Sequence, residues 1–159
     1  WHIKIPKNIK SNFEIQRLYI LSEKNKYKIN SKFCQKKEKI VLDRSFISTL
    51  AYSYADCKTN NVMTDYGKIL KLLENIKYEI LWPTKIIVLD CSIKESIKRR
   101  KRFQNIIEYR KWFDQKFLVN FSDFYHNELP KILKVKPIFV DTSNKTILEV
   151  KNEVMKEIL

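Results

Sequence analysis

The chain has 159 residues, 44% of them hydrophobic and 13% aromatic, which is long enough for a buried core and too apolar for a disordered chain. Its formal net charge of +14, from 32 Lys and Arg against 18 Asp and Glu, favours polyanionic partners such as nucleotides or nucleic acid, unless the lysines only keep the surface soluble. Three cysteines without a CxxC pair argue against a disulfide framework or a zinc site, and no apolar run approaches the roughly 18 residues of a membrane-spanning helix. We therefore expect a cytoplasmic protein without a membrane partner.

Helices are predicted wherever apolar residues recur at spacings of three and four. The predicted helices cover residues 13–29, 45–55, 64–80, a segment after Ser92, 107–129 and 145–158. Thr64 is the expected N-cap of the third helix, and a polar loop is expected at Asp56–Asn61.

Short apolar runs without alternation predict strands that are buried on both faces. These runs are Lys39–Leu42, Lys85–Leu89 and Pro137–Val140. Because helices lie between them, the sequence predicts one α/β domain over residues 1–159, with a parallel sheet covered by helices on both faces.

Each predicted strand ends in an aspartate: Asp43, Asp90 and Asp141. Arg44 follows Asp43 directly, at the kind of strand end beyond which ligands bind in open α/β sheets. An acid beside a guanidinium suits a ligand that carries phosphate, because Arg meets phosphate with a planar fork of donors. The alternative is an ordinary strand end with a structural ion pair, and for Asp90 we favour a capping role.

The sequence contains a single glycine, Gly67. A phosphate-binding loop of the Walker A type needs at least two glycines at fixed spacing, so these residues include no such loop. The sequence also begins at Trp1 rather than at Met, and we expect further residues, with the first βα unit, ahead of it.

Residues 43–52, DRSFISTLAY, resemble a stretch of the thymidylate kinases of the P-loop kinase superfamily, which reads Asp-Arg-aromatic-x-x-Ser-x-x-Ala-Tyr after a strand. Trp82-Pro83 ahead of a strand ending in Leu89-Asp90, and residues 139–143, FVDTS, are similar to later family segments in the same order. The resemblance covers about residues 13–158. It implies a three-layer, P-loop-kinase-like fold whose first βα unit is missing. It also implies transfer of the ATP γ-phosphoryl group, with Mg²⁺, to a deoxynucleoside monophosphate, with dTMP as the expected acceptor.

The resemblance also implies roles for single residues on the acceptor side. Asp43 would act near the acceptor phosphate and, indirectly, near magnesium, and Arg44 would hold that phosphate. Tyr19 would stack on the base, and Tyr52 would pack against the deoxyribose. The remaining acceptor-side residues that it implies are Ser48, Thr49 and Ser53.

On the ATP side the resemblance implies a lid at about residues 99–108. Arg99 and Arg102 would reach the transferring phosphoryl group as catalytic residues. The other residues that it implies for ATP binding are Arg100, Asp141, Thr142 and Ser143.

The sequence departs from the family pattern at three places. Glu23 stands where an arginine is usual, Ser45 stands in place of an aromatic residue, and residues 105–108 lack the lid arginine. Asp43-Arg44-Ser45 also resembles deoxynucleoside kinases, so a nucleoside kinase or a divergent P-loop phosphotransferase is the alternative. A further alternative is a catalytically degenerate, basic module that binds nucleic acid. Nucleotides are the expected partners, and a homodimer is left open.

Two further features receive structural interpretations. An aromatic stripe at helical spacing predicts a core face rather than a base-stacking platform. Its members are Tyr109, Phe113, Phe117, Phe121 and Phe124. His2 and His126 have no partners at metal-ligand spacing, so we assign them neither metal binding nor catalysis.

Overall fold

The structure, a computed structural model, describes residues 11–36 and 39–159. The described residues are mostly helical, and the strands found among them are β1 (Ile87–Asp90) and β2 (Ile138–Asp141). The chain divides into two compact units, Trp1–Trp82 and Pro83–Leu159, each with its own buried residues. That the two units fold as one domain stays a prediction.

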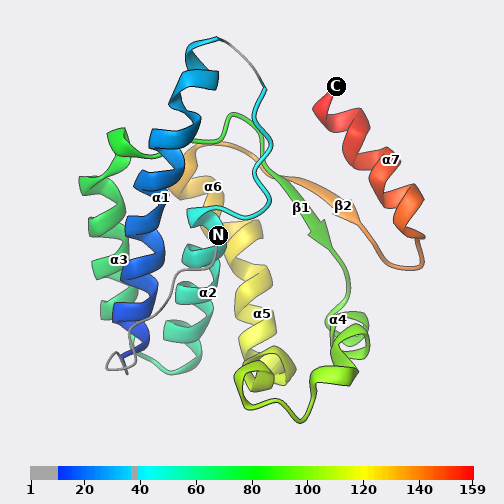
Figure 1. Ribbon diagram of the computed structural model, residues 1–159. Helices are drawn as coiled ribbons and strands as arrows, with labels where there is room; N and C mark the ends of the chain where they lie inside the picture. The colour runs from blue at the N-terminus through cyan, green and yellow to red at the C-terminus, as the bar shows by residue number, and fades with distance from the viewer. Residues whose placement is uncertain (1–10, 37–38) are drawn as a thin grey trace. The chain divides into compact units, whose positions relative to one another are not determined.

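The first unit is a bundle of three helices, α1 (Asn12–Gln35), α2 (Phe46–Thr59) and α3 (Met63–Asn75), each of which contacts the other two, followed by a 3-10 turn, η1 (Lys77–Glu79) (Figure 1). Phe46 and Leu50, four residues apart on α2, are completely buried and face its neighbours. Ala51 and Ala55 are also completely buried, and such small side chains let the helices approach closely.

The second unit contains the two strands and the remaining helices. β1 and β2 pair in parallel, with Ile87 opposite Ile138 and Asp90 opposite Asp141. Parallel strands need a long crossover, and here the whole segment 91–137 supplies it. Its elements are α4 (Ile93–Arg100), the 3-10 helices η2 (Lys101–Phe103) and η3 (Ile107–Phe113), α5 (Gln115–Asp123), the π-helical turn η4 (Phe124–Glu128) and α6 (Leu129–Leu133). The last helix, α7 (Ile147–Ile158), contacts β2.

The predicted three-layer parallel sheet, covered by helices on both faces, is wrong. The described residues form a small sheet of two strands in a mostly helical protein. The predicted strand at Lys39–Leu42 is irregular, and the Val41 side chain is 69% exposed. A strand exists only by pairing, and no strand of the described residues pairs with this run. The other two predicted strands, and their parallel direction, are confirmed.

Local hydrogen bonds explain where the helices differ from prediction. The expected helix 107–129 is interrupted at Asp114, whose Oδ1 accepts hydrogen bonds from the backbone N–H groups of Lys116 and Phe117 and so starts α5 as an N-cap. α2 continues to Thr59 through the expected loop, because Asp56 is buried there and its carboxylate accepts hydrogen bonds from Asn12 and Asn60.

Of the two helix N-caps that the sequence predicted, one is confirmed and the other is wrong. Ser92 caps α4 as expected, since its Oγ accepts from the Glu95 N–H. Thr64 is not the N-cap of α3, which begins at Met63 after Val62 and has no side-chain cap there. Of the aromatic stripe, Phe117 and Phe124 are buried core residues as predicted, whereas Tyr109 is 39% exposed.

Candidate functional site

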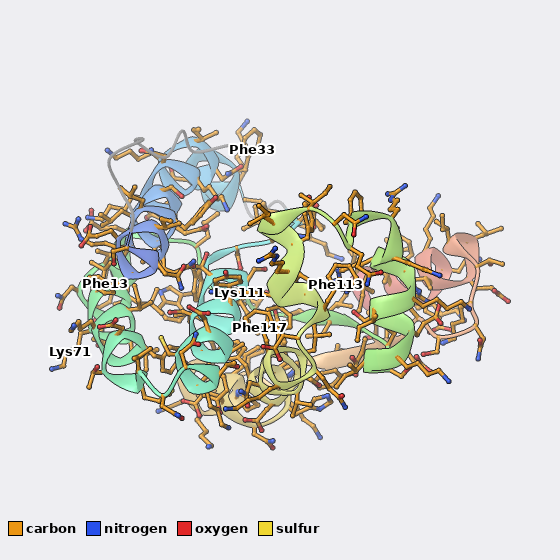
Figure 2. The ribbon with its side chains drawn as sticks, turned by 90° about the horizontal axis from the view of Figure 1, so that it is seen from below. Phe13, Phe33, Lys71, Lys111, Phe113 and Phe117 are labelled. Atoms are coloured by element: carbon orange, nitrogen blue, oxygen red, sulfur yellow. The ribbon has the colours of Figure 1, made fainter. Side chains whose placement is uncertain are left out.

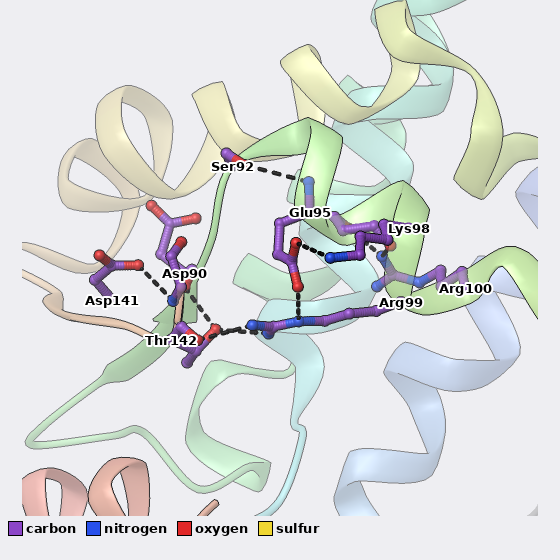
Figure 3. Close-up of polar contacts among 10 residues, drawn as sticks. Asp90, Ser92, Glu95, Lys98, Arg99, Arg100, Asp141 and Thr142 are labelled. Carbon is purple, nitrogen blue, oxygen red and sulfur yellow. Dashed lines mark hydrogen bonds and ion pairs between the residues drawn. The ribbon is translucent and has the colours of Figure 1, made fainter. Parts of the chain in front are cut away.

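The carboxyl ends of β1 and β2 form one edge of the second unit, which we call the carboxyl edge (Asp90, Asp141, Thr142 and Ser143; Figure 3). Because the strands are parallel and in register, Asp90 and Asp141 end them at the same level. Beyond them the Thr142 N–H and Oγ1 both donate to the Asp90 carbonyl, at 2.8 and 2.9 Å. Thr142 is 8% exposed, so this hydrogen-bonded pair is held inside the unit.

Arg99 joins α4 to the carboxyl edge (Figure 3). Its Nη1 donates to Thr142 Oγ1 at 2.9 Å and its Nη2 donates to the Thr142 carbonyl at 2.8 Å. Its Nε donates to Glu95 Oε1 at 3.0 Å, one turn back on the same helix. All three guanidinium nitrogens therefore have partners within the protein. Arg99 would have to give up these bonds before it could reach a phosphoryl group.

Asp141 closes the turn that follows β2. Its Oδ1 accepts from the Ser143 N–H at 2.8 Å. Hydrogen bonds from the Ser143 backbone and side chain, and then the positive charges of Lys145 and Arg99, hold the pKa of the Asp141 carboxyl below its usual value. The group is thus an anion at neutral pH, in a site that also contains cations.

His126 reaches the same edge from the π-helical turn η4. Its ring stacks on Phe139 with centroids 4.0 Å apart and an interplanar angle of 2°, and its Nε2 lies 3.6 Å from Asp90 Oδ2. The other carboxylate oxygen of Asp90 accepts from the Cys91 N–H at 2.9 Å, whereas the N-cap of α4 is Ser92, so the capping role expected of Asp90 is not found at this helix. Sequence reasoning gave His126 no place in a site, because 36 positions separate it from Asp90 and no spacing links them.

The other lid arginines lie against aromatic rings. Arg100 bonds to Ser96, through both the carbonyl and the hydroxyl, and its guanidinium lies 5.1 Å from the centre of the Trp112 ring. Arg102 lies 4.6 Å from the centre of the Phe103 ring, and its side chain is exposed. The Arg100 side chain is thus held by contacts within the protein, whereas the exposed Arg102 side chain is accessible to a ligand.

The acceptor-side residues belong to the first unit, where Asp43 and Arg44 are exposed and immediately precede α2. Ser45 is the N-cap of α2, and its Oγ accepts from the Ile47 N–H at 3.3 Å. The Arg44 backbone has φ of 63°, in the left-handed region that residues with a side chain rarely occupy.

The remaining predicted acceptor residues lie on α1 and α2. Ser48 and Tyr52, four residues apart on α2 and so on one face of it, are half-buried, as is Thr49. Ser53 is 3% exposed, which leaves it little access to a ligand. Tyr19 is 36% exposed on α1.

The structure thus brings together Arg99, Asp141, Thr142 and Ser143, four residues predicted for the ATP side. Within the described residues no group of three or more His, Cys, Asp or Glu side chains is arranged to hold a metal ion. None of the helices in that part of the chain is long and apolar enough to cross a membrane.

Neither a protein-family model nor a curated protein matches the chain.

Proposed function

We propose that the protein is a nucleotide phosphotransferase that transfers the γ-phosphoryl group of ATP to a deoxynucleoside monophosphate, with dTMP as the first acceptor to test. The proposal rests on the resemblance of residues 43–52 and 139–143 to thymidylate kinases. Phosphoryl transfer depends mainly on positioning the reactants and on neutralising the charge of the phosphates, and arginines supply the positive charge for this.

The observation that carries the proposal is the backbone of Arg44. Among the described residues, four that are not glycine have positive φ: Arg44, Asn61, Lys134 and Asn144. Asparagine tolerates this region, and Lys134 is the C-cap of α6, where it is common. Arg44 has neither explanation. A left-handed residue of this kind costs about 1–3 kcal/mol, and such strained residues cluster at active sites and ligand-binding segments.

The surroundings of Arg44 suit an anionic ligand. Its side chain is exposed, and it stands beside the N-terminus of α2, a 14-residue helix whose first backbone N–H groups point away from the helix. The guanidinium would hold the acceptor phosphate through its fork of donors. Ser48 and Tyr52 would then face the nucleoside from the same side of α2.

We favour a monophosphate over a nucleoside as the acceptor. The nucleoside kinase alternative rests on Asp43-Arg44-Ser45 and on Glu23, and two of these residues, Ser45 and Glu23, have local explanations. Ser45 caps α2, and Glu23, which is 5% exposed, pairs with Lys26 at 2.7 Å. Neither residue therefore needs a substrate to account for it.

The described residues fit Mg²⁺ better than they fit ATP. Mg²⁺ keeps most of its water and binds through phosphates and one or two carboxylates, so the exposed Asp43 suffices on the protein side. Such an ion would neutralise charge on the phosphates. For ATP these residues provide Asp141, Thr142 and Ser143 but no phosphate-binding loop, since the sequence has one glycine.

The test is a kinetic assay of the full-length protein with ATP and Mg²⁺ against a panel of nucleosides and monophosphates. We expect turnover of dTMP, and we expect Arg44→Ala to raise KM for the monophosphate about tenfold or more while KM for ATP stays unchanged. Arg17→Ala is the matched control, because Arg17 is an exposed arginine of the same unit, on α1. Equal losses for ATP and for the monophosphate would contradict the role of Arg44. Salt-sensitive binding to random oligonucleotides without turnover would instead favour the nucleic-acid-binding alternative.

A further inference from the structure

The second unit contains a shallow cavity of about 320 Å³, largely open to solvent, that has no part in the chemistry described above. Its walls come from the last turn of α4, from η2 and the residue after it, and from the end of η3. The described residues that line it are Ile97, Lys98, Lys101, Gln104 and Phe113. The volume falls within the range of small-molecule sites, which is about 300–1,000 Å³.

Helical spacing explains why these side chains meet. Ile97, Lys101 and Gln104 follow one another at steps of four and three residues, so they share one face although the chain passes from α4 into η2. Phe113 belongs to η3 and lies on the side of that helix that faces α4 (Figure 2). The cavity is therefore apolar between Ile97 and Phe113 and cationic at Lys98 and Lys101.

Among the described residues, the charge of this cavity is only weakly compensated. Residues 98–102 are five consecutive basic residues. Arg99 and Arg100 are committed to Thr142, Glu95 and Ser96, but the nearest carboxylate to Lys98 is Glu95 at 3.8 Å, and the Lys98 side chain is 79% exposed. An exposed pair of that length contributes little. None of the described lining residues is acidic.

We propose that this cavity binds a small organic anion that has a flat apolar body and a terminal phosphate or carboxylate. The body packs between Ile97 and Phe113, where removal of apolar surface from water provides affinity. The anionic group meets the ammonium groups of Lys98 and Lys101, and the Gln104 amide offers it one neutral donor. Lys101 and Gln104 lie within the implied lid segment 99–108, but no lining residue of the cavity is assigned a contact with ATP or with the acceptor, so the inference does not rest on the phosphotransferase proposal.

The first experiment measures binding to the full-length protein by titration calorimetry, with naphthyl phosphate, naphthoate, inorganic phosphate and the neutral naphthalene methanol. We expect the two aromatic anions to bind at least about tenfold more tightly than the other two probes. The tighter of the two anions identifies the terminal group as phosphate or carboxylate. Equal binding of naphthalene methanol, or of inorganic phosphate, would overturn the proposal.

The second experiment places the binding in the cavity. The Lys98→Ala/Lys101→Ala variant should bind the tighter anion about tenfold more weakly, and the loss should shrink as salt is raised. Lys151→Ala/Lys156→Ala is the matched control, because both lysines are exposed on α7 and the change in net charge is the same. Gln104→Ala, an exposed position that is safe for folding, should weaken binding severalfold. Equal affinities of the two double variants, with unchanged circular dichroism, would place the site elsewhere and refute the assignment.

Discussion

The hydrogen bonds between Arg99 and Thr142 predict a measurable coupling between α4 and the segment after β2. Thr142→Val is the main perturbation, because valine keeps the shape of threonine and removes only the hydroxyl. That hydroxyl accepts from Arg99 Nη1 and donates to the Asp90 carbonyl, each at 2.9 Å. The Asp90 carbonyl keeps a second donor, the Thr142 N–H at 2.8 Å, so the substitution leaves it satisfied.

The magnitude follows from the two bonds that are lost. A neutral hydrogen bond contributes about 1 kcal/mol, and one to a charged group about 1.5–3 kcal/mol. The Arg99 side chain is 42% exposed, so solvent screening reduces its bond to Thr142 to about 1 kcal/mol. Thr142→Val should therefore lower the free energy of unfolding by about 2 kcal/mol. Arg99→Met should lower it by a similar amount, since it removes both bonds to Thr142 and the bond to Glu95.

The assay is a double-mutant cycle in urea denaturation, followed by circular dichroism. The single bond that both substitutions remove should make the double variant about 1 kcal/mol more stable than the sum of the single effects predicts. The control cycle pairs Thr142→Val with Arg110→Met, an exposed arginine of the same unit on η3, and should show no coupling. A coupling below about 0.3 kcal/mol for Arg99 would refute the inference that this guanidinium holds the carboxyl edge.

Three other predictions concern single residues. The free energy of unfolding of Arg44→Gly should be about 1 kcal/mol higher than that of Arg44→Ala, because glycine adopts positive φ without strain and alanine does not. Equal urea midpoints of the two variants would remove the observation that carries the proposed function. The pKa of Asp141 is lowered by folding, so its stabilising effect is present above the unfolded value of 3.8 and is lost as the pH falls through the folded value; in acid titrations Asp141→Asn should show a smaller loss of stability in that range than the wild type. Asp114→Ala should lower the free energy of unfolding by about 1 kcal/mol, because the first N–H groups of α5 lose their acceptor, and thermal melts that show no change would contradict the capping role.

The two strands that the sequence predicted correctly are paired with each other. The runs before Asp90 and Asp141 pair with each other, so their apolar, unalternating pattern corresponds to β1 and β2. The run Lys39–Leu42 has the same pattern and no partner strand among the described residues, so it stays irregular and exposed. Pattern alone cannot show whether a pairing partner exists.

The sequence predicted several residues of the candidate site but not the contacts between them. The family resemblance implied ATP-side roles for Asp141, Thr142 and Ser143, and these residues do lie at the carboxyl edge. The bonds of Arg99 to Thr142 span 43 positions of the chain, and the stacking of His126 on Phe139 depends on a π-helical turn. Neither contact leaves a periodic signal in the sequence. The positive φ of Arg44 is equally hidden, since arginine has no preference for that region.

The most direct test of the proposed function is the affinity of the full-length protein for dTMP and for thymidine, measured by calorimetry in the wild type, Arg44→Ala and Arg17→Ala. A phosphate held by Arg44 predicts that dTMP binds at least about tenfold more tightly than thymidine in the wild type and in Arg17→Ala, and that the difference largely disappears in Arg44→Ala. Equal affinities for the two ligands in the wild type, or a preference for dTMP that survives in Arg44→Ala, would contradict it.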